Sequence, residues 1–378
     1  MSDTPRTDRD GSSPLHRALA LAERALFLTP PNPRVGCVIT AADGAVLGEG
    51  HTQAAGGPHA EVMALRDAAA RGHDVRGATV WVTLEPCAHF GRTPPCCDAL
   101  AAAGVGRVVV TNIDPNPRVA GQGLERLRAA GVAVELLSPD HPLAMASREL
   151  NIGFFSRMER QRPWVRLKVA ASADGRTALP NGVSQWITSP EARLDGHRWR
   201  ARACAVLTGV GTVLADDPRL DARDVDAPRQ PHAVVLDSRL RTPPTARLFE
   251  AQAHRRVWIY TAVDDAARRA ALEARGAEVI VLPAADGRVA LDALLADLAR
   301  REVNELHVEA GETLNGALLA AGLVDEWLMY LAPLMLGAGR GMAALGPYTN
   351  LDTVPRWIWH EVTRVGPDSR LRARQASN

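Results

Sequence analysis

The hydrophobic pattern of the first part of the chain switches repeatedly between helical and strand periodicity. Apolar residues recur every three or four positions in some segments, and short β-branched runs lie between those segments. Because the two patterns alternate, they predict an α/β domain in which helices cover both faces of a sheet. The predicted helices are residues 14–26, 59–72, 96–105 and 123–132. The predicted strands are residues 34–41, 45–52, 78–86, 107–114 and 133–137.

The pattern weakens between residues 138 and 162, where we expect one helix through the middle of the segment and an end at Pro163. A domain boundary is expected in this stretch, so that residues 13–150 and 151–378 form separate domains. Residues 1–12 show no apolar periodicity and are predicted to form a disordered tail.

A second alternation of strand and helix patterns begins after Pro163, and no internal repeat relates it to the first. It predicts a second α/β domain. The predicted strands are residues 164–172, 205–210, 232–237, 256–261, 278–282, 305–310 and 326–333. The predicted helices are residues 190–203, 264–275, 289–302 and 313–321.

The composition is that of a globular, soluble protein. The chain has 378 residues, more than one core usually organises, of which 46% are hydrophobic and 23% charged. A net charge of +1 does not favour a nucleic-acid partner. No apolar run is long enough to cross a bilayer, and the N-terminal segment lacks the apolar core of a secretory signal. We therefore expect a cytoplasmic protein with no membrane partner, whose five cysteines are ligands, nucleophiles or core residues rather than disulfides.

Two short motifs carry candidate metal chemistry. "PHAE" places His59 and Glu61 where a helix begins, and "TLEPCAHFGRTPPCC" places Cys87 after a strand and Cys96 at the next helix start. Zinc accepts one imidazole and two thiolates and keeps its fourth position for water. A His-x-Glu followed by Pro-Cys and a later cysteine is the signature of zinc deaminases, in which the glutamate transfers protons. We expect zinc on His59, Cys87 and Cys96, with Glu61 as the catalytic residue.

The spacing of the two cysteines departs from that signature, because eight residues instead of two separate them. The longer loop is expected to bring Arg92 and Thr93 beside a polar substrate. A closed structural zinc site is the alternative, and it requires a fourth ligand, for which His89 and Cys97 are candidates. We expect Cys97 to be a packed core residue.

The motifs "NPRVGCVI" (32–39), "HAEVMAL" (59–65) and "TLEPCAHFGRTPPC" (83–96) together resemble the N-terminal domain of the bifunctional riboflavin-biosynthesis deaminase–reductases. The resemblance implies a cytidine-deaminase-like α/β/α domain that removes ammonia from 2,5-diamino-6-(5-phosphoribosylamino)pyrimidin-4(3H)-one. It also implies that Asn32 binds this substrate. The alternative is that Asn32 is an ordinary turn residue between two prolines. Ala88 stands where the family commonly has serine.

Four later segments resemble the reductase half of the same family, which has a dihydrofolate-reductase-like α/β fold and uses NADPH. They are "LKVAASADGRTA" (167–178), "SQWITS" (184–189), "TGVGTVLADDPRL" (208–220) and "VEAGETLNGALL" (308–319). The last reads as a strand, a tight turn and a helix whose first N–H groups suit a dinucleotide phosphate. The implied reaction reduces 5-amino-6-(5-phosphoribosylamino)uracil to its ribitylamino product.

The resemblance also implies the binding residues of the second domain. Arg200 and Arg223 suit a phosphate because the guanidinium fork matches its oxygens, and the alternative is a solvated helix face or rim. The expected NADPH contacts are Ala170, Trp186, Thr212, Asp216, Ser238, Gly311, Glu312, Thr313, Leu314, Asn315, Gly316 and Ala317. The expected substrate contacts are Ser184, Arg200, Leu220, Arg223 and Glu309. From its place on the first strand of this domain, Lys168 is also expected to face the reacting centre and to contact the substrate.

Further expectations concern four single positions, the assembly and the competing functions. The alternative for Trp186 is a buried core residue, and Lys168 has the alternative of a strand-edge charge. Asp221 departs from the family's usual "LTVR", and Arg239 is a candidate for the cofactor's 2′-phosphate. We expect a homo-oligomer, either a dimer or a tetramer. The competing functions are a nucleoside or nucleic-acid deaminase with an added domain, and a zinc-stabilised binding protein.

Overall fold

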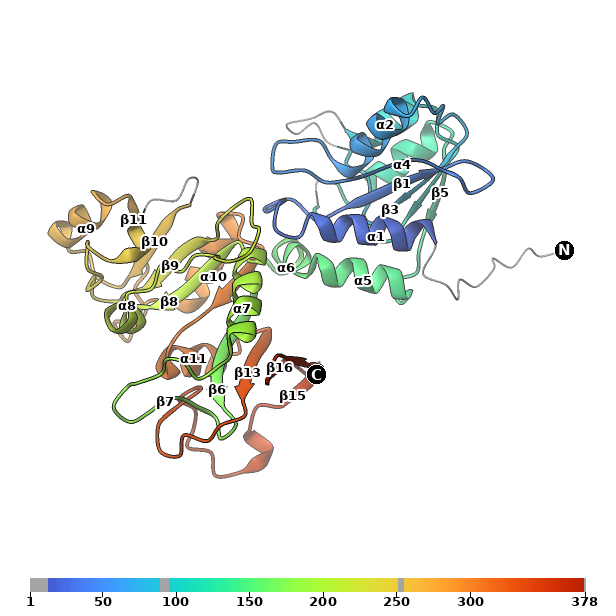
Figure 1. Cartoon of the computed structure of the whole chain (residues 1–378). Coiled ribbons are helices and arrows are strands. Elements are labelled where there is room, and N and C mark those ends of the chain that lie inside the picture. Colours follow the sequence, from blue (N-terminus) through green and yellow to red (C-terminus); the bar gives the residue numbers. More distant parts are fainter. Residues whose placement is uncertain (1–12, 89–94, 118, 251–254, 377–378) are drawn as a thin grey trace. The chain divides into compact units, whose positions relative to one another are not determined.

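The computed structural model describes residues 13–88, 95–117, 119–250 and 255–376, and it divides the chain into two compact units (Figure 1). The first unit ends at Arg160 and the second begins at Gln161. The predicted disordered tail lies outside the described residues. Among those residues, no helix combines the length and the apolar character needed to span a membrane. Each unit is described by itself.

The first unit is a five-stranded sheet with helices on both faces (Figure 1). The strand order is β2-β1-β3-β4-β5, in which β1 is antiparallel to β2 and β3 while β3, β4 and β5 are parallel. The strands are β1 (Gly36–Thr40), β2 (Val46–His51), β3 (Thr79–Val82), β4 (Arg107–Val110) and β5 (Ala133–Leu136). The helices are α1 (Pro14–Arg24), α2 (Ala60–Ala70), α3 (Cys96–Ala102), α4 (Gln122–Ala129), α5 (Pro142–Leu150) and α6 (Ile152–Arg160).

Strand alternation decides which helix covers which face of this sheet. Val38 of β1 packs against α1, whereas its neighbours Cys37 and Ile39 belong to the cluster that α2, α3 and α4 complete. Helix α2 can lie close to β2 because two strand positions are glycine. A Cβ on Gly48 would lie 2.3 Å from the Ala64 carbonyl oxygen, and one on Gly50 2.6 Å from the Ala64 nitrogen. This close approach fixes the start of α2, where the candidate zinc ligand lies.

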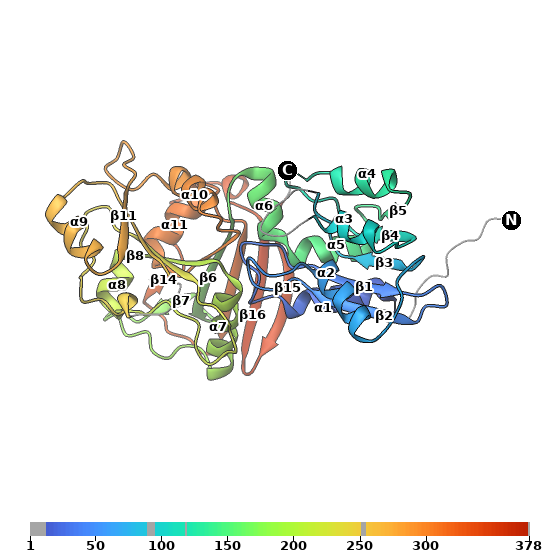
Figure 2. The ribbon, with the colours of Figure 1, turned by 90° about the horizontal axis from the view of Figure 1, so that it is seen from above.

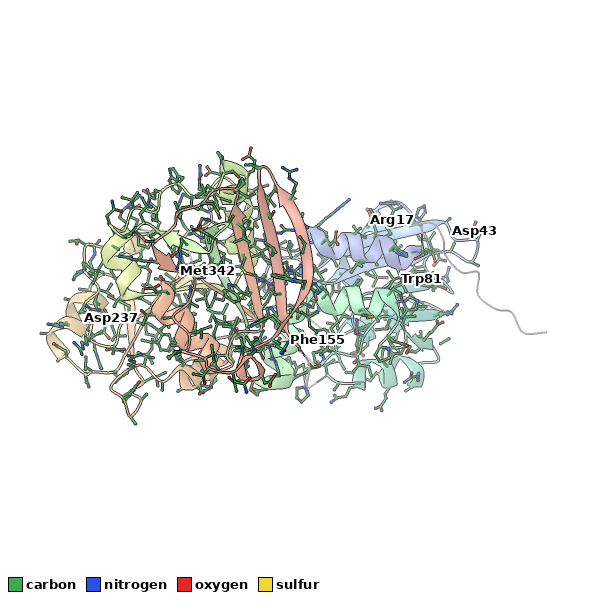
Figure 3. All side chains as sticks on the ribbon, turned by 90° about the horizontal axis from the view of Figure 1, so that it is seen from below. Arg17, Asp43, Trp81, Phe155, Asp237 and Met342 are labelled. Atoms are coloured by element: carbon green, nitrogen blue, oxygen red, sulfur yellow. The ribbon has the colours of Figure 1, made fainter. Side chains whose placement is uncertain are left out.

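The boundary falls ten residues later than the expected division after residue 150, because α6 packs with the first unit. Phe154 and Phe155, the latter labelled in Figure 3, are buried in the core of the first sheet. The buried Asn151 accepts the Arg34 N–H at 2.7 Å and donates to the Arg34 carbonyl at 2.9 Å. The single helix expected in this stretch is therefore two helices, and Asn151 ends the first of them.

The second unit is built on a nine-stranded sheet in the order β11-β10-β9-β8-β12-β6-β13-β16-β15. Its strands are parallel from β11 to β13, and β16 and β15 follow as an antiparallel pair. The long strands are β6 (Trp164–Ser172), β8 (Ala205–Gly209), β9 (His232–Leu236), β10 (Val257–Thr261), β11 (Ala277–Val281), β12 (Glu305–Val308), β13 (Glu326–Ala332), β15 (Trp357–Val365) and β16 (Asp368–Gln375). A small separate pair joins β7 (Arg176–Ala178) to β14 (Arg340–Gly341).

Helices cover both faces of the second sheet as well (Figure 2). Leucines of α10 and α11 pack against Val165, Leu167 and Val169 of β6, while Trp199 of α7 packs on the opposite face. The helices are α7 (Pro190–Arg202), α8 (Val210–Asp216), α9 (Ala266–Glu273), α10 (Leu291–Arg300) and α11 (Glu312–Ala320), with short 3-10 turns at Arg247–Phe249 and Leu351–Thr353.

Every helix and strand expected from the sequence is present, with ends that differ by a few residues. The strands expected at 78–86 and 107–114 stop at Val82 and Val110, and the residues after them form loops at the candidate metal centre. Helix α8 and the β15–β16 pair were not expected. The segment "DSRLRARQ" of β16 looks too polar for a strand next to a core.

A buried ion-pair network explains how these arginines are accommodated. Arg166 is fully buried, and it donates to Glu326 at 2.6 Å and to Glu305 at 3.0 Å. Glu326 also accepts hydrogen bonds from Arg372 at 2.8 Å and from Arg374 Nε at 3.0 Å. The network therefore fastens β16 to the centre of the sheet.

Glu326→Gln should destabilise the second unit by about 3–5 kcal/mol, because it removes the carboxylate charge that Arg166, Arg372 and Arg374 share in the interior. The midpoint of urea unfolding, followed by far-UV circular dichroism, measures the change. Asp286→Asn, which removes an exposed partner of Arg288, is the matched control and should leave the midpoint unchanged. Equal midpoints for the two variants would contradict the proposed contribution of the network to the stability of the second unit.

Candidate active sites

Three side chains in the first unit converge with the spacing of a metal centre. His59 stands directly before α2, Cys87 follows the end of β3, and Cys96 begins α3. The His59 Nδ1 atom lies 3.5 Å from the Cys87 sulfur and 3.3 Å from the Cys96 sulfur. Tetrahedral zinc, with bonds of about 2.3 Å to sulfur and 2.0 Å to nitrogen, separates such ligand atoms by roughly 3.5 Å. The donor set and its spacing therefore fit zinc.

The cluster contains three metal-binding groups among the described residues, namely His59, Cys87 and Cys96. Cys97, a candidate fourth ligand, instead packs in the core of the first sheet. His89, the other candidate, lies outside the described residues, as do Arg92 and Thr93. Three protein ligands are the pattern of a catalytic zinc site, which keeps one position open.

The surroundings of the two ligand cysteines favour a thiolate. The pKa of Cys87 is lowered to about 4, first because the Cys96 thiol donates a hydrogen bond to it and also because His59 lies beside it. The Cys96 backbone N–H at the start of α3 points at the same sulfur, at 3.3 Å. Cys96, the donor of the pair, has a raised pKa. Negative charge gathered on sulfur beside an imidazole is what a divalent cation requires.

Glu61 lies in the first turn of α2 and is 3% exposed. Burial raises the pKa of its carboxyl to about 7, and the negative charge of Cys87 adds to the effect. It is outside the ligand cluster but close enough to interact electrostatically with His59 and Cys87. A carboxyl that takes up and releases a proton near neutral pH suits general acid–base chemistry.

Two further buried carboxyls lie around this metal centre, and neither was expected from the sequence. Glu85 accepts backbone N–H groups of Asp114, Gly121, Gly123 and Leu124 at 2.9–3.3 Å, which fixes the loop before α4 to the end of β3. Burial raises the pKa of Asp114 to about 7, and its carboxyl interacts with His59 and Cys87. The only indication of Asp114 in the sequence was its position after the end of β4. Asn32 lies in a turn, with its N–H bonded to the Thr29 carbonyl.

In the second unit, charged side chains gather where parallel strands end. Strands β8 and β12 are neighbours, but the chain leaves β8 through α8 towards β9 on one side and leaves β12 through α11 towards β13 on the other, and ligands of α/β proteins bind at such a switch point. Glu309 directly follows β12. Its carboxylate accepts Nε and Nη2 of Arg200 at 2.5 and 2.8 Å and lies 3.9 Å from the Lys168 ammonium. Burial alone would raise the pKa of Glu309, but these cations hold it well below its usual value.

The hydrogen bonds of Arg200 differ from the sequence-based expectation. Its fork is directed at Glu309, and its remaining nitrogen, Nη1, donates to the Asp221 carbonyl at 3.0 Å. Arg223, in contrast, has a side chain that is 43% exposed and pairs with Asp221. The structure thus favours Arg223 over Arg200 as the arginine that meets a phosphate from solution. Lys168 is not an edge charge, since β6 lies inside the sheet and burial lowers its pKa.

The start of α11 offers unpaired backbone donors. Gly311 provides no side-chain cap, and the N–H groups of Glu312, Thr313 and Leu314 make no hydrogen bond within the described chain. Such a helix start is an anion site, and it fits the phosphates of NADPH.

Part of the expected cofactor motif has a different use. The Glu312 carboxylate accepts the Gly341 N–H at 2.9 Å, and the Asn315 amide donates to the carbonyl of Met342, labelled in Figure 3, at 2.8 Å. A Cβ on Gly316 would lie 2.0 Å from the Ala344 carbonyl oxygen. These three residues hold the 341–344 segment against α11. The side chains of Glu312 and Asn315 are therefore committed to these hydrogen bonds, and the backbone carries the anion-binding capacity.

The other expected cofactor residues lie on separate elements of the second unit. Ala170 is on β6, Thr212 and Asp216 are on α8, and Ser238 follows β9. Asp237, labelled in Figure 3, accepts the Thr242 N–H and hydroxyl and so fixes the turn that carries Ser238 and the exposed Arg239.

Trp186 is 68% exposed, which excludes the core alternative. The Arg193 guanidinium lies 4.4 Å from the centre of its ring. Both residues line a groove of about 420 Å³ whose walls include Thr188, Ser189 and the segment after β13. Ser184 lies in the loop that leads to this groove.

Comparison with known proteins finds relatives of both units. Residues 9–112 match the cytidine and deoxycytidylate deaminase zinc-binding region, and residues 163–371 match the RibD C-terminal domain. The riboflavin biosynthesis protein RibD of Escherichia coli K12 is 46% identical over 366 residues, which cover 93% of this chain and 96% of that protein. The corresponding protein of Haemophilus influenzae is 42% identical over 372 residues, covering 94% and 95%.

Two solved structures share the whole architecture. Acinetobacter baumannii RibD, form 1, has a TM-score of 0.87 and 40% identity, with 96% of this chain and 98% of that chain covered. The diaminohydroxyphosphoribosylaminopyrimidine deaminase/5-amino-6-(5-phosphoribosylamino)uracil reductase of Thermotoga maritima has a TM-score of 0.84 and 31% identity, with the same coverage.

The fold and the two sites define a zinc-dependent deaminase domain joined to an NADPH-dependent reductase domain of the dihydrofolate-reductase-like type. Within that class, the chain belongs to the RibD family of riboflavin biosynthesis proteins.

Adjacent cysteines allow a matched test of the metal centre. Cys96→Ala should reduce the zinc content from about one ion per chain to near zero, because an imidazole and one thiolate remain. Cys97→Ala should keep the zinc, since the Cys97 thiol packs in the core. Metal analysis of the purified proteins by mass spectrometry measures both. Loss of zinc from Cys97→Ala alone would reverse the ligand assignment.

Proposed function

We propose that the chain catalyses two consecutive steps of riboflavin synthesis. The first unit deaminates 2,5-diamino-6-(5-phosphoribosylamino)pyrimidin-4(3H)-one, and the second reduces 5-amino-6-(5-phosphoribosylamino)uracil with NADPH. The observation that carries the proposal is the convergence of His59, Cys87 and Cys96 beside the buried Glu61, in one chain with the Glu309 cluster at the switch point of the second sheet. Membership of the RibD family supports both substrates.

The deaminase mechanism follows from the residues around the metal centre. Zinc held by His59, Cys87 and Cys96 supplies a Lewis acid that makes a water molecule acidic. Glu61 takes a proton from the attacking water and returns protons to the ring nitrogen and to the departing amino group. Water and the amine are thereby converted into a ring carbonyl and ammonia. The pKa of Glu61 near 7 suits both directions of transfer. Asn32, in the turn before β1, would hold the substrate.

The reductase mechanism relies mainly on orientation. When bound, NADPH would be the source of the hydride for reduction at C1′ of the ring-opened ribose. The α11 start, Gly311 to Leu314, would hold the cofactor phosphates, and the residues on β6, α8 and the β9 turn would line its path. Arg223 would bind the substrate phosphate. Lys168 and Glu309 would face the sugar, where Arg200 fixes the orientation of the Glu309 carboxylate.

We further propose a cytoplasmic homo-oligomer, a dimer or a tetramer, that acts on this small molecule and needs no nucleic-acid or membrane partner. Strand β15 supports the assembly. It is the edge strand of the second sheet, and Ile358, Trp359 and Val362 on it are 58–66% exposed. A long edge strand with exposed apolar side chains is a template for pairing with another chain, here a second copy.

Glu61→Gln should lower the rate of ammonia release by about 10²–10⁴-fold, because the amide cannot transfer the protons. Zinc content should stay near one ion per chain, and NADPH oxidation with the deaminated substrate should be unchanged. A coupled assay of ammonia release and NADPH absorbance measures both activities. Glu23→Gln, on the exposed side of α1, is the control. Wild-type ammonia release by Glu61→Gln would exclude the mechanism.

Val362→Lys should shift the chain towards monomers, because it places a charge in the middle of the exposed edge. Light scattering coupled to size exclusion measures the mass. Val263→Lys changes another exposed valine of the same unit, outside β15, and should leave the mass unaltered. If both variants keep the wild-type mass, β15 does not carry the assembly.

A further inference from the structure

Arg255, just before β10, is a partly buried cation whose set of hydrogen-bond partners among the described residues is incomplete. Its Nε donates to the Pro231 carbonyl at 3.0 Å, and its Nη2 donates to the Leu220 carbonyl at 2.9 Å. The third nitrogen, Nη1, is buried and has no hydrogen-bond partner among the described residues. Neither of the two contacts is a carboxylate, so within this part of the chain the guanidinium charge has no directly bonded counter-ion. A charge buried in this way is costly unless another group completes its surroundings.

The wider cluster also carries surplus positive charge. Arg200 and Lys168 share Glu309, and Arg223 pairs with Asp221. Arg255 interacts electrostatically with both Asp221 and Arg200. Among the described residues of this cluster, four cations thus face two carboxylates. The neighbouring His197 adds no charge near neutral pH, since burial lowers its pKa to about 4. A phosphate monoester carries nearly two negative charges near pH 7 and would balance the surplus.

Arg255 also supports the backbone that presents Arg223. Leu220 adopts a left-handed conformation, with φ of 54°, and its side chain is buried. A non-glycine residue keeps that conformation only where its surroundings enforce it, and the Arg255 bond to the Leu220 carbonyl does so. Three residues further on, the Arg223 N–H donates to His197 Nδ1 at 3.2 Å. The 220–223 loop is therefore held at both ends.

We propose that Arg255 is a positioning residue for the phosphate group of the reductase substrate. It fixes the Leu220 carbonyl and hence the loop that directs Arg223 towards the phosphate, and it supplies part of the positive charge that the dianion neutralises. The inference rests on the proposed reductase function and adds to it the residue that organises the phosphate end of the site.

Steady-state kinetics with the full chain and the deaminated substrate test the proposal. Arg255→Met should raise the KM for the phosphorylated substrate by about tenfold or more, with kcat within about twofold and the KM for NADPH unchanged. Arg255→Lys retains the charge but loses the fork, so its KM should lie between those of the wild type and Arg255→Met. Arg256→Met removes a neighbouring exposed arginine and should behave as the wild type.

Inorganic phosphate provides a probe that needs no turnover. Phosphate should protect the wild type and Arg256→Met against thermal unfolding and should inhibit reduction, and both effects should weaken by about tenfold in Arg255→Met. If Arg255→Met fails to fold, as judged by circular dichroism, the same comparison is made with Arg255→Lys. An equal effect on the dephosphorylated substrate, or a fall in kcat alone, would overturn the proposal. A wild type that binds phosphate but never oxidises NADPH would instead refute the proposed reductase function.

Discussion

The second unit depends on one constraint, the side-chain alternation of its central parallel strands. Along β12 and just beyond it, alternation places Glu305, His307 and Glu309 on the face that α7 covers, and along β6 it places Arg166 and Lys168 there. Carboxylates beneath a helix are tolerated only when cations meet them. At one end of this layer the carboxylates pair with arginines of β16 and hold that strand against the sheet. At the other end, after the strands stop, the charged groups around Glu309 remain accessible to a ligand.

The two sites solve opposite electrostatic problems. In the first unit, sulfur ligands and the buried Glu61 concentrate negative charge around an imidazole, and a divalent cation satisfies them. In the second unit, arginines and a lysine outnumber their carboxylates, and in the proposed reductase the anionic groups of substrate and cofactor would satisfy them. In each case the candidate ligand-binding residues are those whose charge the protein leaves unmatched, while a charge that is bonded directly to carboxylates, such as that of Arg166, serves the fold.

The sequence predicted those features whose residue types and spacing are sufficient by themselves. His59, Cys87 and Cys96 fall into this class, because few other combinations place an imidazole and two thiolates at two helix starts and a strand end. Arg200 and Arg255 do not, because their partners lie far away in the chain and an arginine in isolation looks solvated. The polar strand β16 was missed for the same reason: its arginines are buried only because Glu326 and Glu361 meet them. Ion pairs between residues far apart in the chain cannot be predicted from the local pattern of apolar and polar residues.

The place of α6 decides how the two activities could be separated by protein engineering. A gene fragment cut where the helical pattern first fades would encode a first unit without Phe154 and Phe155, and its core would be exposed along one side. A fragment that runs to Arg160 retains both rings and also keeps the Asn151 amide on the Arg34 backbone. The three residues that remain before β6 are then the whole tether between a free-standing deaminase and its reductase.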